Sequence, residues 1–370
     1  MTPLEREISD LIAQEGPISV ERYMRLAVSH PRHGYYATRD PFGAAGDFIT
    51  APEISQIFGE LIGLWAADCW ALIGRPERLC LVELGPGRGT LMADALRAAR
   101  VAPAFRAALR LHLVETSEPL RRRQRDALAQ GGVPISWHMR FEDVPRGPTI
   151  AVANEFFDAL PIRQYLRAER GWHERLVGLG AQGALSLGLS AQIEPSIRLP
   201  APVGAILEIS PDALALAHAI GERLVAHGGA ALVIDYGHAK PGFGDTLQAV
   251  RRHGFADPLA SPGENDLTAH VDFAALGEAA RGSGAAVRGP VMQGDFLRSL
   301  GVEARARALQ ESATPSKATG IATALARLTG DGDGEMGTLF KVMAIADPRL
   351  GDLAGFAAPA DDLRGPPDPR

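Results

Sequence analysis

The chain has 370 residues, of which 46% are hydrophobic and 22% charged, the balance of an ordinary soluble globular protein. Its formal net charge of −6 leaves no general basic surface for nucleic acid phosphates, so a nucleic acid partner is not expected. The two cysteines, Cys69 and Cys80, can build neither a disulfide framework nor a cysteine metal cage, and we expect a reducing, cytoplasmic location.

Residues 1–75 are predicted to be mainly helical and to form an N-terminal cap. Thr2 and Glu5 make a capping box around Pro3, and a second helix is predicted over residues 20–29. A loop over 30–47, interrupted by Pro and Gly, precedes a helix over 54–73. The acidic start lacks the basic segment and the apolar segment of a secretion signal. No apolar run in the sequence approaches the ~20 residues that a membrane helix requires.

From residue 76 onwards, strand and helix patterns alternate. Strands are predicted over 79–84, 109–115, 135–138, 149–153, 230–235 and 337–345, and helices over 90–100, 119–130, 211–226, 273–280, 296–310 and 316–328. This order predicts an α/β domain over 76–347 with a Rossmann-like parallel sheet covered by helices on both faces. Residues 163–199 read as a small antiparallel insertion, 238–272 as a second insertion, and 348–370 as a flexible tail rich in Pro, Asp and Gly.

A glycine loop follows the first strand of this domain. Gly85, Gly87 and Gly89 come two residues after Glu83, and glycines at a strand-to-helix turn let backbone N–H groups approach a ligand. The spacing G-x-G-x-G differs from the dinucleotide fingerprint G-x-G-x-x-G, and the acid at 83 suits a cationic ligand such as S-adenosylmethionine. A nicotinamide oxidoreductase on the same sheet remains the competing interpretation.

Acids and an aromatic residue follow the next two strands, where ligands of open α/β sheets bind. Glu115 ends the second strand and can accept hydrogen bonds from both ribose hydroxyls of an adenosine. After the third strand, Phe141 can stack on adenine, while Glu142 or Asp143 can receive its amino group. The alternatives are an exposed turn acid at 115 and plain loop residues at 141–143.

Asn154, Glu155 and Asp158 stand at the end of the fourth strand. These polar groups are concentrated at the position that would face a reacting methyl group. Two carboxylates there can grip a guanidinium in a bidentate manner. The alternative is that Asn154 caps a helix and Asp158 is solvated. His253 and His270 also invite a catalytic role, but neither stands near a cysteine or second histidine in a metal-ligand spacing, so no metal site is predicted.

Taken together, these segments resemble the MidA-like class I methyltransferases, whose mitochondrial member is an assembly factor for respiratory complex I and methylates an arginine on one of its subunits. The resemblance covers residues 5 to about 345. It rests on five segments in order: GDFITAPE at 46–53 with Gln56, Phe58 and Gly59; ELGPGRG at 83–89; NEFFDALP at 154–161; DYG at 235–237; and DLTAHVDF at 266–273.

The resemblance implies S-adenosylmethionine as cofactor and direct methyl transfer to a protein arginine, with a complex I subunit as a possible substrate. It implies cofactor binding by Asp47, Thr50, Glu83, Gly85, Pro86, Gly87, Gly89, Glu115, Phe141 and Glu142, and catalysis by Asn154, Glu155 and Asp158. A non-catalytic assembly factor that retains the fold is the other alternative. The acceptor residue and the oligomeric state stay open.

Overall fold

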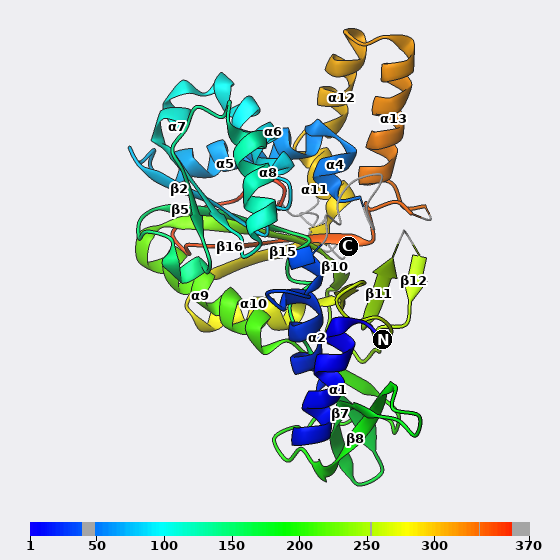
Figure 1. Cartoon of the computed structure of the whole chain (residues 1–370). Helices are drawn as coiled ribbons and strands as arrows, with labels where there is room; N and C mark the ends of the chain where they lie inside the picture. Colours follow the sequence, from blue (N-terminus) through cyan, green and yellow to red (C-terminus); the bar gives the residue numbers. More distant parts are fainter. Residues whose placement is uncertain (39–48, 252–253, 333, 357–370) are drawn as a thin grey trace, which may run out of the picture.

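The computed structural model describes residues 1–38, 49–251, 254–332 and 334–356. Its central sheet has the strand order β15-β16-β10-β5-β2-β3-β4, with β14 attached to β10 (Figure 1). Strands β2 to β5 and β10 run parallel, whereas β16 runs antiparallel to both of its neighbours. The predicted mostly parallel sheet is confirmed. The strands are β2 (Leu79–Leu84), β3 (Leu109–Val114), β4 (Ile135–His138), β5 (Thr149–Asn154), β10 (Gly229–His238), β14 (Val271–Asp272), β15 (Ala286–Met292) and β16 (Phe340–Ala346).

Helices cover both faces of this sheet (Figure 1). Side chains from alternate strand positions point to opposite faces, so Leu81 and Leu232 join one core while Val82 and Val233 join the other. The first core is closed by α5 (Gln56–Leu72), α6 (Thr90–Ala98), η1 (Ala99–Val101), α7 (Pro103–Ala108) and α8 (Glu118–Leu128), and the second by η2 (Phe141–Asp143), α9 (Pro211–His227) and α10 (Phe273–Gly282).

The N-terminal helices pack on the first insertion. A five-stranded antiparallel sheet joins β1 to the chain around 163–209, and its apolar face shares a core with α1 and α2. Ile18 of β1 pairs with Val177 of β7, and both side chains are buried. The elements are α1 (Pro3–Glu15), β1 (Ile18–Ser19), α2 (Val20–Ser29), α3 (Tyr35–Thr38), β6 (Arg163–Ala168), β7 (Gly171–Leu179), β8 (Leu185–Ile193) and β9 (Ile206–Ile209).

A smaller sheet lies within the second insertion. It has the order β12-β11-β13 and consists of β11 (Gln248–Arg251), β12 (Gly254–Ala256) and β13 (Asp266–Thr268). Ala249 and Leu267 of this sheet belong to the same core as α1 and α2. The two insertions and the N-terminal helices therefore meet around one apolar core beside the main sheet.

Several element predictions were wrong. The helix expected over 296–310 is two helices, because Gly301 takes a left-handed φ of +87° between α11 (Gln293–Ser299) and α12 (Val302–Glu311). Strands β9 and β15 and the short helix α3 were not predicted. Helices α12 and α13 (Pro315–Thr329) form a hairpin that projects from the body of the molecule (Figure 1).

Candidate active site

A cavity of about 640 Å³ lies at the carboxyl ends of β2, β3, β5 and β10, where the fold predicts a ligand site. Walls of different origin meet there: the glycine loop, the end of β5, the short helix α4 (Ala51–Ile54), and the small sheet of the second insertion. Its lining includes the predicted residues Thr50, Glu83, Gly85, Pro86, Gly87, Glu115, Asn154, Glu155 and Asp158. The cavity therefore joins the predicted cofactor side and the predicted acceptor side.

The glycine loop has the conformation that its residues suggest. Gly85, Gly87 and Gly89 have φ angles of +63°, +52° and +84°, which side-chain-bearing residues rarely adopt. Gly89 begins α6, while a Cβ at Gly85 would lie 2.7 Å from the ring of Phe156. Gly89 does not line the cavity, and its part is to turn the chain into α6.

Glu83 is the second-last residue of β2, and its carboxyl group is buried. Its Oε2 atom has no hydrogen-bond partner, and burial, followed by the nearby Glu115, raises its pKa to about 8. A cationic amino group would supply both the missing donor and the missing charge. This orphaned oxygen fits the amino end of S-adenosylmethionine.

Glu115 lies one strand away and is held by two donors. Its Oε1 accepts from the Ser117 N–H at 2.8 Å, and its Oε2 accepts from Gln124 Nε2 at 3.2 Å. Gln124 also donates to the carbonyl of Gly87 at 2.8 Å, so it links the expected ribose acid to the glycine loop. Sequence reasoning missed Gln124. Its spacing of four from Leu120 and Leu128, both buried, places it on the inward face of α8.

The predicted adenine residues do not reach the cavity. Phe141 is buried in the core on the α9 side, and the Arg223 guanidinium stacks 4.5 Å from its ring centre. Glu142 is exposed, and neither residue lines the cavity. The stacking role predicted for Phe141 does not fit this geometry, because its ring is buried in that core and does not line the cavity. Met139, which sequence reasoning also missed, lines the cavity just after β4.

On the acceptor side, Glu155 is the first residue beyond β5. It is a non-glycine residue with a left-handed φ of +50°, a conformation that concentrates at functional sites. Its Oε1 accepts from the Ala51 N–H at 3.0 Å and from Asn154 Nδ2 at 3.1 Å. Burial raises the pKa of Glu155 to about 7. Asn154 Oδ1 is buried without a partner.

Asp158 faces the same cavity three residues later. Burial raises its pKa to about 6, although the Tyr236 hydroxyl donates a hydrogen bond to its carboxylate. Tyr236 and His270 line the adjoining wall with their rings edge to face, 5.6 Å between centres. The structure thus brings Asn154, Glu155 and Asp158 together. His253 lies outside the described residues, and these contain no cluster of three metal-ligating side chains.

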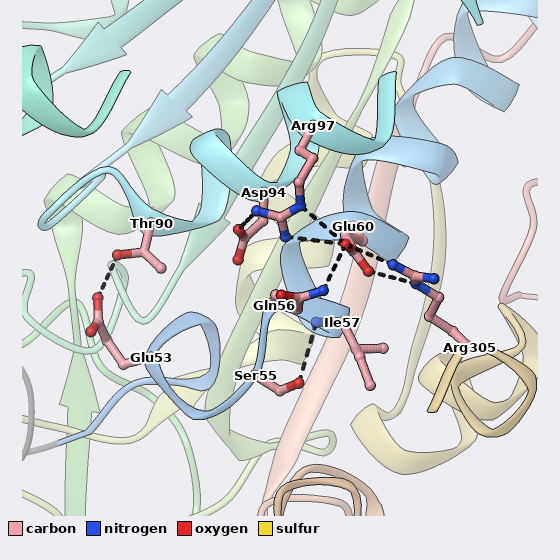
Figure 2. Close-up of polar contacts among 9 residues, drawn as sticks. All are labelled: Glu53, Ser55, Gln56, Ile57, Glu60, Thr90, Asp94, Arg97 and Arg305. Carbon is pink, nitrogen blue, oxygen red and sulfur yellow. Dashed lines mark hydrogen bonds and ion pairs between the residues drawn. The ribbon is translucent and has the colours of Figure 1, made fainter. Parts of the chain in front are cut away.

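Helix α4 joins the two sides of the site. Thr50 lines the cavity at its start, and Glu53 accepts a hydrogen bond of 2.5 Å from the Thr90 hydroxyl at the start of α6 (Figure 2). Asp47 lies outside the described residues. Because Ala51 binds Glu155 while Glu53 binds α6, α4 contacts both the acceptor loop and the helix of the cofactor loop.

An ionic network surrounds the buried acid Glu60 (Figure 2). The Glu60 carboxylate of α5 accepts from Arg97 of α6 at 3.1 Å and from Arg305 of α12 at 2.7 Å. These bonds lower the pKa of Glu60 despite its burial. Gly59 and Gly63 let α5 approach α6 closely, since a Cβ at either position would come within 2.7 Å of α6 atoms. The network therefore ties the projecting α12–α13 hairpin to the helix that begins at the cofactor loop.

Comparison with known proteins identifies the family of the chain. A family model described as "Putative S-adenosyl-L-methionine-dependent methyltransferase" matches residues 61–291, more than half of the chain. The chain belongs to this family. The methyltransferase is 38% identical to "Protein arginine methyltransferase NDUFAF7, mitochondrial" of Danio rerio over 84% of this chain and 79% of that one. The Homo sapiens protein of the same name is 37% identical over 84% and 76% of the two chains.

A solved structure extends the comparison to the whole fold. The crystal structure of a Burkholderia thailandensis protein bound to S-adenosyl-homocysteine superposes on the methyltransferase with a TM-score of 0.81. The two are 28% identical, and the match covers 97% of this chain and 96% of the other. The fold is the class I methyltransferase fold, and the chain is an S-adenosylmethionine-dependent methyltransferase.

Proposed function

We propose that this methyltransferase transfers a methyl group to an arginine side chain of a protein. The observation that carries the proposal is the surplus of hydrogen-bond acceptors on the acceptor side. Asn154 Oδ1 is buried without a donor, Glu155 is half-buried and Asp158 is buried, and burial raises the pKa values of both carboxyl groups. A guanidinium has five N–H donors, no acceptor and a positive charge, so it complements this set.

The names of the relatives support the same acceptor. The Danio rerio and Homo sapiens proteins are called protein arginine methyltransferases. A lysine ammonium would also find acceptors here, but its compact charge does not use two carboxylates in a planar, bidentate way. Glu155 and Asp158 lie on one turn, and two carboxylates placed in this way suit the planar guanidinium of arginine better than the ammonium group of lysine.

Glu155 and Asp158 have two proposed roles in methyl transfer, which are to stabilise charge and to accept a proton. When bound, S-adenosylmethionine supplies a methyl group on a sulfonium sulfur, and the carbon–sulfur bond breaks with its electron pair left on sulfur. Glu155 and Asp158 hold positive charge on the guanidinium nitrogens that do not react, which leaves electron density on the nitrogen that does. After the new nitrogen–carbon bond forms, the proton lost from that nitrogen passes to a carboxylate; the raised pKa values of both acids suit them to receive it.

The mouth of the cavity suits a polypeptide. Phe255 of β12 lines it with 85% of its surface exposed, and Leu339 lies beside the acceptor wall. Exposed apolar side chains at the rim of a polar pocket mark protein contacts. We propose that they contact the polypeptide around the target arginine.

By the family resemblance, the proposed acceptor is a subunit of respiratory complex I, methylated in the cytoplasm. Among the described residues, no helix is both long and apolar enough to span a bilayer.

Labelling tests this proposal. The purified protein is incubated with tritiated S-adenosylmethionine and a lysate from cells that lack its gene, and the labelled band is analysed by mass spectrometry. Methylarginine in a complex I subunit is the expected result. Methyl-lysine would overturn the arginine assignment. Tight binding of the cofactor with no labelled protein would favour the non-catalytic assembly factor instead.

A further inference from the structure

Asp235 is a buried carboxyl group that stands behind the acceptor turn. It lies near the end of β10, directly beside β5, and its exposed fraction is 0%. It does not line the cavity, so it cannot contact a ligand there. A buried acid with no access to ligand requires another explanation, because burying a carboxyl group is unfavourable without compensating hydrogen bonds.

The compensation comes from the acceptor turn. One oxygen, Oδ2, accepts from three consecutive backbone N–H groups, those of Phe156 at 3.2 Å, Phe157 at 3.0 Å and Asp158 at 3.2 Å. The other oxygen accepts from the Tyr236 N–H at 3.0 Å. Three successive N–H groups that converge on one atom define the path of the turn.

This path determines where the acceptor acids lie. Glu155 immediately precedes the three N–H groups and has the left-handed φ of +50° that non-glycine residues avoid. A strained residue persists only where its surroundings hold it. Its own N–H donates to the Ile234 carbonyl at 2.9 Å, one residue before Asp235. The end of β10 thus holds the turn on both sides of Glu155.

We propose that Asp235 is a positioning residue for methyl transfer, which holds the 155–158 turn so that Glu155 and Asp158 both face the cavity. The proposal rests on the acceptor role given to those two acids under the proposed function. Asp235 acts through the backbone and touches neither donor nor acceptor. Burial, followed by the charges of the neighbouring Asp158 and Glu155, raises its own pKa well above the ordinary value.

Two variants and a matched control test the role. Asp235→Ala removes the carboxylate that accepts from the N–H groups of residues 156–158. Asp235→Asn removes one of its two oxygens and keeps the size of the side chain. Asp347→Asn is the control, because Asp347 is also buried and accepts a backbone N–H, that of Arg349 at 3.0 Å, but lies at the other end of the sheet. Circular dichroism melts establish that each variant is folded.

The first readout separates positioning from general damage. We expect the initial rate of labelling of the lysate acceptor to fall by about 100-fold in Asp235→Asn, because a displacement of about 1 Å has that effect. Affinity for S-adenosyl-homocysteine, measured by titration calorimetry, should change far less, and Asp347→Asn should change neither. A wild-type labelling rate in Asp235→Asn, or a parallel loss of rate and affinity, would overturn the proposal.

A second readout does not require an acceptor. In hydrogen exchange followed by mass spectrometry, peptides covering 156–158 should lose protection in Asp235→Ala, while peptides covering 83–89 keep theirs. If the wild-type protein labels nothing, the proposed function fails, but this experiment still decides whether Asp235 holds the turn. Unchanged exchange at 156–158 in Asp235→Ala would show that it does not.

Discussion

The backbone N–H of Ala51 lies 3.0 Å from the carboxylate of Glu155, so a residue of α4 binds directly to the acid proposed to hold the substrate. One oxygen of that carboxylate is occupied by protein donors, from Ala51 and Asn154. Among the described residues, the other oxygen, Oε2, receives no hydrogen bond, and the side chain lines the cavity. Glu155 therefore anchors α4 and is also the acid that we propose to bind the substrate, so its charge and its hydrogen-bonding capacity can be tested separately.

Glu155→Gln keeps an acceptor for the Ala51 N–H but removes the charge. We expect the rate of methyl transfer to fall by roughly 100- to 1,000-fold, the usual effect of removing one group that stabilises charge in the transition state. Binding of S-adenosyl-homocysteine should remain close to wild type. The test compares tritium transfer with calorimetric titration, and unchanged turnover would remove Glu155 from the acceptor role.

Proton release tests the pairing of Glu83 with the cofactor. With a pKa raised to about 8, most Glu83 side chains carry a proton at pH 7 in the free protein. A cationic amino group beside the carboxylate lowers its pKa, so binding should release up to about one proton per site. Calorimetry of S-adenosyl-homocysteine binding at pH 7 in buffers of different ionisation enthalpy measures this number.

Glu83→Gln is the control for that measurement. It cannot release a proton from residue 83, so the number released should fall towards zero and the affinity should also fall. An equal number of protons from wild type and Glu83→Gln would show that another group titrates on binding.

Buried carboxyl groups also determine how stability depends on pH. Burial raises the folded-state pKa of Glu155 to about 7 and of Glu83 to about 8, above their unfolded values. Their contribution to stability is therefore complete below the unfolded pKa and is lost as pH rises through the folded pKa. Between pH 6.5 and 8 we expect the free energy of unfolding of the ligand-free protein to fall by about 2 kcal/mol.

Urea unfolding across that pH range checks the sign. His112, whose pKa burial lowers to about 4, acts in the opposite direction but only below its unfolded value of about 6.5, outside the window. A double variant, Glu83→Gln with Glu155→Gln, should have a smaller slope than the wild type, and Asp235, whose pKa burial also raises, should account for a remaining fall. A wild-type stability that rises from pH 6.5 to 8 would contradict the assigned burial of these acids.

Removal of the Glu60 carboxylate should weaken the fold more than the site. Glu60→Ala leaves Arg97 and Arg305 without their shared acceptor, but both guanidinium groups are partly exposed and can be hydrated. We expect a loss of about 1 to 3 kcal/mol in the free energy of unfolding, measured with urea. Glu118→Gln, which breaks an exposed ion pair with Arg125, should cost clearly less, because solvent screens that pair. Equal losses in the two variants would mean that the network adds nothing.

A substitution of the exposed rim residue Phe255 tests the proposed contact with the polypeptide substrate. Phe255→Ser should raise KM for the protein acceptor by roughly 10-fold, since an apolar anchor at an interface contributes more than 1 kcal/mol. The values of kcat and cofactor affinity should stay unchanged. Val101→Ser is the matched control, because Val101 is also strongly exposed, at 77%, but does not line the cavity. The same KM for both variants and wild type would place the acceptor elsewhere.

Much of the site could be predicted because the ligand-binding residues of this fold lie at the carboxyl ends of its strands. Glu83, Glu115 and Asn154 each lie within one residue of a strand end, and the parallel sheet brings these ends to one edge. A run of apolar residues followed by an acid is visible in the sequence without any knowledge of distant contacts. The same local signal located the glycine turn.

Phe141 shows why the rest could not be predicted. Which way its ring points depends on Arg223, which lies 82 residues later on α9 and stacks on it. No local pattern encodes such a partner. The helix boundary at Gly301 was missed for another reason, since a glycine within an apolar period is compatible with a continuous helix until its φ is known. Strand β15 contains Gly289 and Pro290, residues that are poor strand signals.

The contact between Gly85 and Phe156 constrains how this enzyme can change over evolution. The donor loop and the acceptor turn touch where a single missing Cβ makes room for an aromatic ring. A variant with a larger residue at 85 would have to shrink residue 156, and the acceptor wall would shift with it. A substitution at residue 156 therefore alters both the acceptor turn and the fit of the glycine loop, so this one position of the turn cannot vary independently of the loop.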